Sequence, residues 1–378
     1  MKKIRVLECI RQGTIGGGES HVIELSSSLD KSRFEPLVLS FSDGQMIETL
    51  KCLGIRSFII PSRRAFDFTI WGKVRDLIIK EKIDIVHAHG TRANSNVFWA
   101  AKNTGKPLVY TIHGWSFHPD QGPQKRRVIE LSEKFLTNQA DVNIAVSISN
   151  QNDGITRFNM PRSTVIYYGI NRDAFILNRD FKDIRSELGI SPDTIVVLYM
   201  VRITLQKDPV TMLKAFKSVV EKVPNILLLV VGNGDLKDKA IELATNLGIT
   251  EHVKFINFRK DVPDFLNAAD IYCLPSLWEG LPIGLLEAMY MRKAIVATPV
   301  DGTREVIEDH VNGILFPAQD AAKLSQGIIE LALDKELRER LAENALKTVE
   351  ETLKGQFSIP KMVRDVEDVY LKLLEKQA

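Results

Sequence analysis

The chain has 378 residues, 44% of them hydrophobic and 26% charged, which is typical of a folded, water-soluble protein and excludes a disordered chain. No apolar run reaches the roughly 18 residues that a membrane-spanning helix needs, and the length allows two ordinary domains. The three cysteines, Cys9, Cys52 and Cys273, are too few and too scattered for a disulfide framework, so we expect a reducing, cytoplasmic compartment.

Charge is divided unevenly along the chain, although the formal net charge is only +2. Residues 1–180 hold 25 Lys and Arg against 18 Asp and Glu, whereas residues 181–378 hold 25 against 30. A basic first half favours an anionic partner, such as a phosphate-bearing substrate or a membrane surface. Chance drift between two domains explains the difference equally well.

Short apolar runs alternate with longer amphipathic runs throughout the first half of the chain. The predicted strands are residues 4–10, 35–41, 55–60, 83–89, 107–113, 141–147 and 163–169. Helical patterns, such as residues 19–30 and 69–81, lie between them. Strands separated by single helices form βαβ units around a parallel sheet.

The pattern stops over the polar, turn-rich residues 169–193 and then begins again. Further strands are predicted at residues 194–202, 225–234, 252–258, 269–276, 293–299 and 312–317, and a helical tail follows from about residue 320. We therefore predict two α/β domains, residues 1–175 and 176–355, and a C-terminal helix over residues 356–378. Ligands of such sheets bind beyond the carboxyl ends of the strands, so the loops there are the places to search.

The loop after the first strand is rich in glycine. Gly16, Gly17 and Gly18 precede a predicted helix that Glu19 opens. Glycines let the backbone approach a ligand closely, and a helix start offers free N–H groups to a phosphate. The spacing fits neither the dinucleotide fingerprint nor a Walker loop, so a simple tight turn is an alternative.

The corresponding loop of the second half carries two cations. Arg202 follows the strand at residues 194–202, and Lys207 precedes Pro209, which suits the first turn of a helix. Two cations beside a helix start favour an anion such as a diphosphate. Ordinary exposed basic residues are the simpler alternative.

The stretch "SLWEGLPIGLLEAM", residues 276–289, contains two glutamates, Glu279 and Glu287. We expect Glu279 in a loop, a helix that starts at Pro282, and Glu287 about two turns into it. Free N–H groups near Ile283 and Gly284 would accept a phosphate, while the carboxylates would bind sugar and ribose hydroxyls. The stretch thus fits a nucleotide-sugar. The alternative, an acid and nucleophile pair of a glycoside hydrolase, needs no phosphate site.

Taken together, "GGGESHVIELS", "VRITLQKDP" and "SLWEGLPIGLLEAMYMRKAIVATPVDGTREVIEDHVNGILF" resemble glycosyltransferase family 4. The resemblance spans nearly the whole chain and also includes "DIVHAHG" and "TIHGWSF". It implies the GT-B fold, an α/β architecture of two Rossmann-like domains that face a central cleft. It also implies a hexosyltransferase-type enzyme that retains anomeric configuration and needs neither a metal nor a cofactor.

The resemblance assigns roles to individual residues. Arg202 and Lys207 would hold the diphosphate, Glu279 the sugar hydroxyls and Glu287 the ribose, while His113 would position the transferred sugar. We name Glu279, His113, Arg202 and Lys207 as catalytic. The expected sugar-donor site is Gly17, Gly18, Arg202, Lys207, Glu279, Ile283, Gly284, Leu285 and Glu287.

Two departures from the family pattern leave the exact donor open. Val201 precedes Arg202 and Asp208 follows Lys207 where the family often has glycine at each position, and "YYGIN" replaces the usual linker motif. We expect UDP rather than GDP as the carrier. The choice of base would depend on loop backbone near Arg259 and Lys260.

Several histidines and cations remain. His87 and His89 lie two apart on a strand and could ligate zinc, but the simpler interpretation is one packed histidine and one that lines the cleft. His21 and His118 are weak candidates for the acceptor site. Lys125, Arg126 and Arg127 precede an amphipathic helix that could rest on an anionic membrane or meet a lipid diphosphate, although a solvated surface helix is the commoner outcome.

The predicted function is transfer of a sugar from a nucleotide-sugar to a glycan or lipid-linked acceptor during surface polysaccharide or lipopolysaccharide-type assembly. No nucleic-acid partner is expected. Two alternatives stay open: a sugar-nucleotide epimerase on the same fold, and an inactive protein that only binds nucleotide-sugars.

Overall fold

The structure is a computed structural model that describes residues 3–14, 16–118, 121–175 and 180–376. The chain forms two compact units. Unit 1 extends to Gly169 and resumes at Gln356, and unit 2 is Ile170–Gly355. The sequence pattern placed the first boundary after residue 175 and the second after residue 355.

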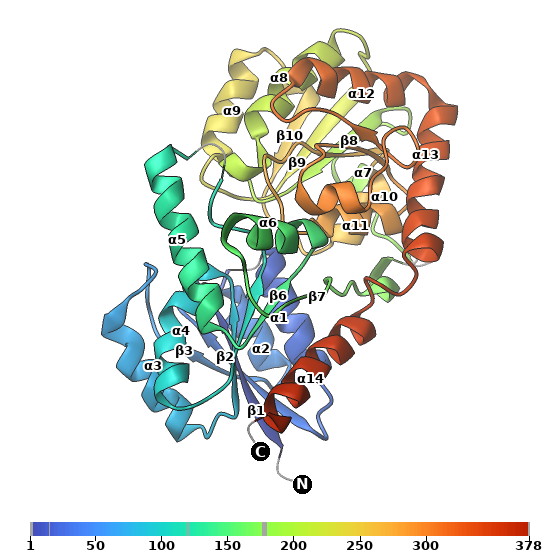
Figure 1. The fold of residues 1–378 in the computed structure, drawn as a ribbon. Helices are drawn as coiled ribbons and strands as arrows, with labels where there is room; N and C mark the ends of the chain where they lie inside the picture. Colours follow the sequence, from blue (N-terminus) through green and yellow to red (C-terminus); the bar gives the residue numbers. More distant parts are fainter. Residues whose placement is uncertain (1–2, 15, 119–120, 176–179, 377–378) are drawn as a thin grey trace. The chain divides into compact units, whose positions relative to one another are not determined.

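Unit 1 contains a parallel sheet of seven strands in the order β3-β2-β1-β4-β5-β6-β7 (Figure 1). The strands are β1 Ile4–Ile10, β2 Phe34–Ser40, β3 Arg56–Ile59, β4 Ile85–His89, β5 Leu108–Ile112, β6 Val142–Ala145 and β7 Ser163–Val165. The helices are α1 Gly17–Ser28, α2 Gln45–Cys52, α3 Phe68–Lys80, α4 Thr91–Asn103, α5 Pro123–Gln139, α6 Ile148–Phe158 and α14 Ile359–Glu375.

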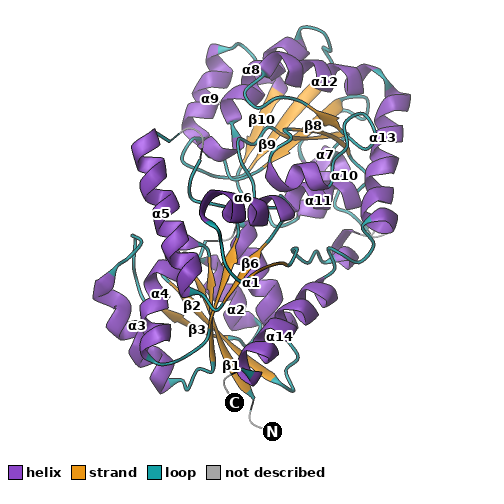
Figure 2. Ribbon diagram, viewed as in Figure 1, coloured by secondary structure: helices purple, strands orange, loops and turns teal. Residues whose placement is uncertain are grey.

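Helices cover both faces of this sheet (Figure 2) because its strands are apolar on both sides. Successive residues of β1 point to opposite faces. Val6 packs in a cluster with residues of α1 and α14, whereas Leu7 packs with residues of α3 and α4. The C-terminal helix is therefore part of the core of unit 1.

Unit 2 repeats the plan with six parallel strands in the order β10-β9-β8-β11-β12-β13. The strands are β8 Ile195–Met200, β9 Ile226–Val231, β10 Val253–Ile256, β11 Ile271–Leu274, β12 Ala294–Ala297 and β13 Ile314–Leu315. The α-helices are α7 Ile184–Glu187, α8 Pro209–Val220, α9 Lys237–Asn246, α10 Val262–Ala268, α11 Ile283–Tyr290, α12 Ala321–Leu333 and α13 Lys335–Lys347.

Both strand orders change direction beside the first strand of the unit. β1 lies between β2 and β4, and β8 lies between β9 and β11. The loops after these strands splay apart at such a switch point, which is where open parallel sheets bind ligands. Among the described residues, no helix is both long and apolar enough to cross a membrane.

Candidate functional site

In unit 2, the loops after β8 and β11 are joined by hydrogen bonds. The Leu277 N–H donates to the Gln206 carbonyl at 2.8 Å, and Gln206 Nε2 donates to the Trp278 carbonyl at 2.9 Å. These bonds bring Lys207 against Glu279, and the two form an ion pair in which the Glu279 side chain is only 6% exposed. The structure thus brings together two predicted residues that are 72 positions apart.

Glu279 is also held through its backbone. Its N–H donates to Asp301 Oδ2 at 2.6 Å, from the short 3-10 helix Asp301–Glu305 that follows β12. Sequence reasoning missed Asp301 and Gln206. Nothing in the sequence around either residue marks it as part of a site, because only the fold places its loop beside Glu279.

Arg202 stands apart from this ion pair. It is exposed and has no hydrogen bond or ion pair with any residue that the structure describes. The loop of Arg202 packs tightly on residues 232–234, which read "GNG". A Cβ atom on Gly232 would lie only 1.9 Å from the Val201 carbonyl oxygen, and one on Gly234 only 2.0 Å from that of Ile203. These two glycines, which sequence reasoning also missed, fix the backbone on either side of the unpaired guanidinium.

Helix α11 corrects the predicted geometry of the two glutamates. Pro282 is its N-cap and the helix begins at Ile283, so Glu287 lies a little over one turn along it and not two. The N–H groups of Ile283 and Gly284 make no hydrogen bond with a described residue, whereas the Leu285 N–H donates to the Pro282 carbonyl at 3.1 Å. The helix start therefore offers two free donors beside the Glu279 loop.

Glu287 is half-buried among apolar neighbours on this helix. Burial raises the pKa of its carboxyl to about 7. A carboxyl with this pKa is partly protonated at neutral pH and becomes fully ionised when hydroxyl groups donate to it. It is therefore a suitable partner for a pair of vicinal hydroxyls.

In unit 1, Gly17 and Gly18 form the first turn of α1, so the expected glycine loop before Glu19 is already helical. Gly18 faces the loop after β5, because a Cβ atom there would lie 3.6 Å from the ring of His113. Gly18 and His113 thus meet at the carboxyl end of the sheet. His21, further along α1, is buried with its ring 5.3 Å from that of His113, and its Nδ1 has no partner among the described residues.

His118 lies in the loop before α5, where its backbone N–H donates to Gln121 Oε1 at 3.1 Å. The ring of His21 lies 5.5 Å from that of His89, 5.3 Å from that of His113 and 5.1 Å from that of Tyr168.

His87 and His89 are both buried, which corrects the expectation that one of them is accessible. With Glu8 they place three potential metal ligands within 4.8 Å of one another. Both ring nitrogens of His87 are already hydrogen-bonded, to Tyr370 at 2.6 Å and to Thr111 at 2.7 Å. This pattern favours a hydrogen-bonded network over a metal centre.

The cations Lys125, Arg126 and Arg127 lie within the first turns of α5 and not ahead of it. Arg126 pairs with Glu130 at 3.2 Å, while Lys125 and Arg127 are exposed. The same helix exposes an apolar stripe at spacings of three and four residues, formed by Val128, Leu131 and Phe135. Apolar and basic side chains therefore share one exposed surface of α5.

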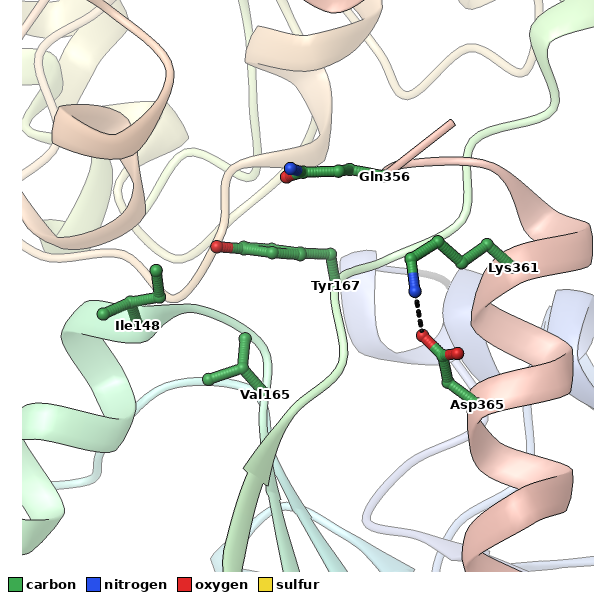
Figure 3. A pocket seen from close by; sticks show the side chains of 6 residues that line it. All are labelled: Ile148, Val165, Tyr167, Gln356, Lys361 and Asp365. Carbon is green, nitrogen blue, oxygen red and sulfur yellow. Dashed lines mark hydrogen bonds and ion pairs between the residues drawn. The ribbon is translucent and has the colours of Figure 1, made fainter. Parts of the chain in front are cut away.

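Two other features have charged side chains that pair within the protein. Arg259 is engaged by Glu187 and Asp261, each at 2.6 Å, so its side chain is occupied, and Lys260 is exposed. A cavity of about 350 Å³ opens in unit 1 beside α14 (Figure 3), but its two charged side chains, Lys361 and Asp365, pair with each other at 2.7 Å. No predicted site residue lines that cavity.

Two family profiles match most of the chain. Residues 180–348 match the profile described as "Glycosyl transferases group 1", and residues 15–174 match the one described as "Glycosyltransferase Family 4". An Escherichia coli protein named UDP-Gal:alpha-D-GlcNAc-diphosphoundecaprenol alpha-1,3-galactosyltransferase is 25% identical over 306 residues, 79% of this chain and 78% of that protein. The N-acetyl-alpha-D-glucosaminyl L-malate synthase of Bacillus anthracis is 28% identical over 82% of this chain and 80% of that protein.

The solved structure of Anabaena HepE in complex with UDP and glucose superimposes with a TM-score of 0.84 at 22% identity, over 98% of this chain and 100% of that one. The glycosyltransferase WaaG, involved in lipopolysaccharide biosynthesis, gives a TM-score of 0.79 at 20% identity, over 96% and 99%. These likenesses show the fold. With two parallel α/β sheets of Rossmann-like order, the predicted GT-B fold class is confirmed.

Proposed function

Because the chain belongs to glycosyltransferase family 4, we propose that it transfers a sugar from a UDP-sugar to a glycan or lipid-linked acceptor, with retention of anomeric configuration and release of UDP. The proposed pathway is the assembly of a surface polysaccharide or lipopolysaccharide-type glycan. The E. coli relative is named for a UDP-sugar donor and a lipid diphosphate acceptor, and the HepE structure contains UDP and glucose. These names support the choice of UDP and of a lipid-linked acceptor.

The observation that carries the proposal is the arrangement around Glu279. The ion pair of Lys207 with the buried Glu279, two N–H groups at the start of α11 and Arg202 all belong to loops at the switch point of one sheet, and those N–H groups and Arg202 have no partner among the described residues. In the free enzyme Glu279 neutralises Lys207. A bound diphosphate would take over Lys207, and Glu279 would then accept hydrogen bonds from the hydroxyls of the sugar.

The proposed chemistry follows from charge. As the bond between the sugar and the phosphate breaks, negative charge grows on the leaving diphosphate. Lys207, Arg202 and the α11 N–H groups would stabilise this charge, and a single such donor is often worth about 3–4 kcal/mol. These two cations and two N–H donors would stabilise the leaving diphosphate, as a divalent metal does in other enzymes. We therefore propose metal-independent transfer, and activity in excess chelator would verify it.

We further propose a front-face path, in which the leaving phosphate helps to deprotonate the acceptor hydroxyl. Glu279 is a carboxylate of the proposed donor site, but its ion pair with Lys207 suits binding better than nucleophilic attack. A glycosyl adduct trapped on Glu279 with a slow fluorinated sugar donor would overturn this path and favour a double displacement.

A peripheral contact with the cytoplasmic face of a membrane is also proposed, through α5. Its exposed stripe of Val128, Leu131 and Phe135 lies beside Lys125 and Arg127. Apolar residues that enter the lipid interface and cations that face anionic headgroups reinforce each other. Such a contact would keep the enzyme near a lipid-linked acceptor.

The proposal is tested first by thermal-shift titration with UDP, GDP, ADP and NAD. We expect selective stabilisation by UDP in the wild type and its loss in the double variant Arg202→Ala, Lys207→Ala, with Lys214→Ala as an exposed control on α8. Stabilisation by another diphosphate would change the proposed base. No shift with any diphosphate would overturn the proposed site.

The second test uses UDP-sugars with an undecaprenyl diphosphate-linked sugar as acceptor. Product NMR gives the anomeric configuration, and an α-linked product from an α-linked donor is the expected result. Conversion of the nucleotide-sugar without any acceptor would instead identify an epimerase.

A further inference from the structure

A chain of side-chain hydrogen bonds runs through the interior of unit 1 and ends on His113. His113 Nε2 lies 3.1 Å from His89 Nδ1, and His89 Nε2 lies 2.8 Å from Glu8 Oε2. On its other side, His113 Nδ1 lies 2.6 Å from the hydroxyl of Tyr168. Four segments thus meet here: β1, β4, the loop after β5 and the segment after β7.

Glu8 is the fixed point of this chain because it is an anion. Burial acts to raise the pKa of its carboxyl, but His87 and the hydrogen bonds from His87 and His89 hold the pKa well below its usual range. An ionised carboxylate only accepts hydrogen bonds. Both of its oxygens are used: Oε2 accepts from His89 and lies 3.1 Å from His87 Nδ1, and Oε1 accepts from the Tyr370 hydroxyl at 2.8 Å.

The direction of every bond in the chain follows from that anion. His89 must carry its proton on Nε2 to donate to Glu8, so its Nδ1 is an acceptor. His113 must then donate from Nε2, which leaves its own Nδ1 to accept from Tyr168. Burial lowers the pKa of both histidines, that of His89 to about 4, so both rings are neutral at neutral pH.

We infer that Glu8 and His89 are positioning residues that fix the tautomer and ring orientation of His113, and that Tyr370 of α14 holds Glu8 in place. The inference rests on the proposed function in placing His113 beside the transferred sugar. Neither Glu8 nor His89 touches the sugar in this scheme. They ensure that His113 presents one hydrogen-bonding pattern, with Nδ1 as acceptor, instead of two.

This arrangement has a chemical consequence for His113. Its Nε2 proton is committed to His89 and its Nδ1 lone pair to Tyr168, so the ring has no spare nitrogen for proton transfer. A sugar hydroxyl could bind His113 only by taking the place of Tyr168 on Nδ1. His113 would then act as an oriented hydrogen-bond acceptor and not as a general acid or base.

The test compares Glu8→Gln with Tyr168→Phe in the full chain labelled with ¹⁵N-histidine. The ¹⁵N shifts of an imidazole report which nitrogen carries the proton, and His113→Gln identifies the signals of His113. In Glu8→Gln an amide N–H faces His89 Nε2, so we expect His113 to change from the pure Nε2–H form to a mixture or to the Nδ1–H form. Tyr168→Phe removes only the outer link, so the tautomer should not change.

Kinetics provide the second readout. Glu8→Gln should lower kcat by roughly 10- to 100-fold, as removal of such supporting partners typically does, with KM for the UDP-sugar unchanged. The KM should not change because the proposed phosphate and ribose contacts belong to unit 2. An unchanged His113 tautomer in Glu8→Gln would overturn the inference whatever happens to the rate.

A matched pair at His89 covers the case in which Glu8→Gln does not fold. The amide of His89→Asn reaches about as far as Nδ1 and can still accept from His113, whereas that of His89→Gln reaches about as far as Nε2 and cannot. We expect His113 to keep its Nε2–H form only in His89→Asn, and equal tautomers in the two variants would overturn the inference. If the wild type transfers no sugar but the tautomers change as expected, the proposed function fails and the positioning network stands.

Discussion

At the scale of single residues, Lys207 and Glu279 should have opposite effects on nucleotide binding. Lys207→Ala removes a charge-assisted hydrogen bond to the diphosphate, worth about 2–3 kcal/mol. It should therefore weaken the binding of UDP roughly 30-fold or more. Glu279→Gln keeps the shape but frees Lys207 from its partner, so UDP should bind as well as in the wild type or better, while sugar transfer falls. Isothermal titration of UDP measures both effects.

The control for this pair is Lys214→Ala, an exposed change on α8 that should leave the affinity for UDP unaltered. Equal weakening of UDP by Glu279→Gln and Lys207→Ala would mean that Glu279 serves the phosphate by holding Lys207. The assignment of Glu279 to the sugar hydroxyls would then be wrong.

Glu287 predicts a pH dependence of donor binding. Burial raises the pKa of its carboxyl to about 7, so the group is protonated below that pH and accepts fewer hydrogen bonds from a ribose. UDP-glucose should therefore bind roughly tenfold more weakly at pH 6 than at pH 8, because at pH 6 the Glu287 carboxyl must lose its proton before it can accept from the ribose. A nucleotide-sugar is the right probe, since UDP itself titrates in this range.

The comparison variant is Glu287→Gln, which cannot ionise. It should bind UDP-glucose more weakly than the wild type at pH 8 and should lose the dependence on pH. A dependence that persists in Glu287→Gln would assign the titration to another group.

At the scale of elements, α5 offers the clearest test of a membrane contact. Each Lys or Arg near an anionic surface contributes about 1 kcal/mol. The double variant Lys125→Ala, Arg127→Ala should thus bind phosphatidylglycerol vesicles about 30-fold more weakly in flotation assays. High salt should weaken the binding of the wild type to these vesicles in the same way, and phosphatidylcholine vesicles, which have no net charge, should bind poorly.

The matched control is Lys335→Ala, Arg340→Ala, which removes the same charge from two exposed positions of α13. If that variant loses as much binding as the α5 variant, the effect reflects net charge and not a surface on α5. Leu131→Ser separates the apolar part, because it should weaken vesicle binding without a change in salt dependence.

Prediction from sequence worked best for elements whose signal is local. Apolar runs marked the strands because parallel strands are buried on both faces, and the reversal of strand order then places the loops of Lys207 and Glu279 side by side. Helix starts were less certain. Helix α1 begins at Gly17, two residues before the expected start at Glu19, and α11 begins at Ile283, one residue after the expected start at Pro282. Tertiary contacts decide how a glycine or a proline is used at a helix start.

The buried network lay beyond any local pattern. Tyr370 donates to Glu8 across 362 positions, and nothing near either residue in the sequence indicates the other. The HxH pattern of β4 did suggest chemistry, but the choice between a metal and a hydrogen-bond network depends on partners from β1, β5 and α14. Long-range side-chain partners are settled only by the fold.

At the scale of the whole molecule, the path of the chain makes the stability of unit 1 depend on its last helix. The chain leaves unit 1 after Gly169 and returns at Gln356, and α14 then completes the core with buried Met362, Val366 and Tyr370. Burial of a large apolar side chain stabilises a domain by about 1.5–3 kcal/mol, so loss of these three alone removes a large part of an ordinary domain stability. Glu8 would also lose its hydroxyl donor.

Truncation after Gly355 should therefore unfold unit 1 and leave unit 2 folded, because α14 contributes to the core of unit 1 only. Hydrogen exchange should show the loss of protection in β1 to β7 and its retention in β8 to β13. Removal of only the residues after Glu375, where α14 ends, should change neither. Loss of protection in both sheets would show that unit 2 needs unit 1 to fold, and protection retained in β1 to β7 would show that the sheet of unit 1 does not depend on α14.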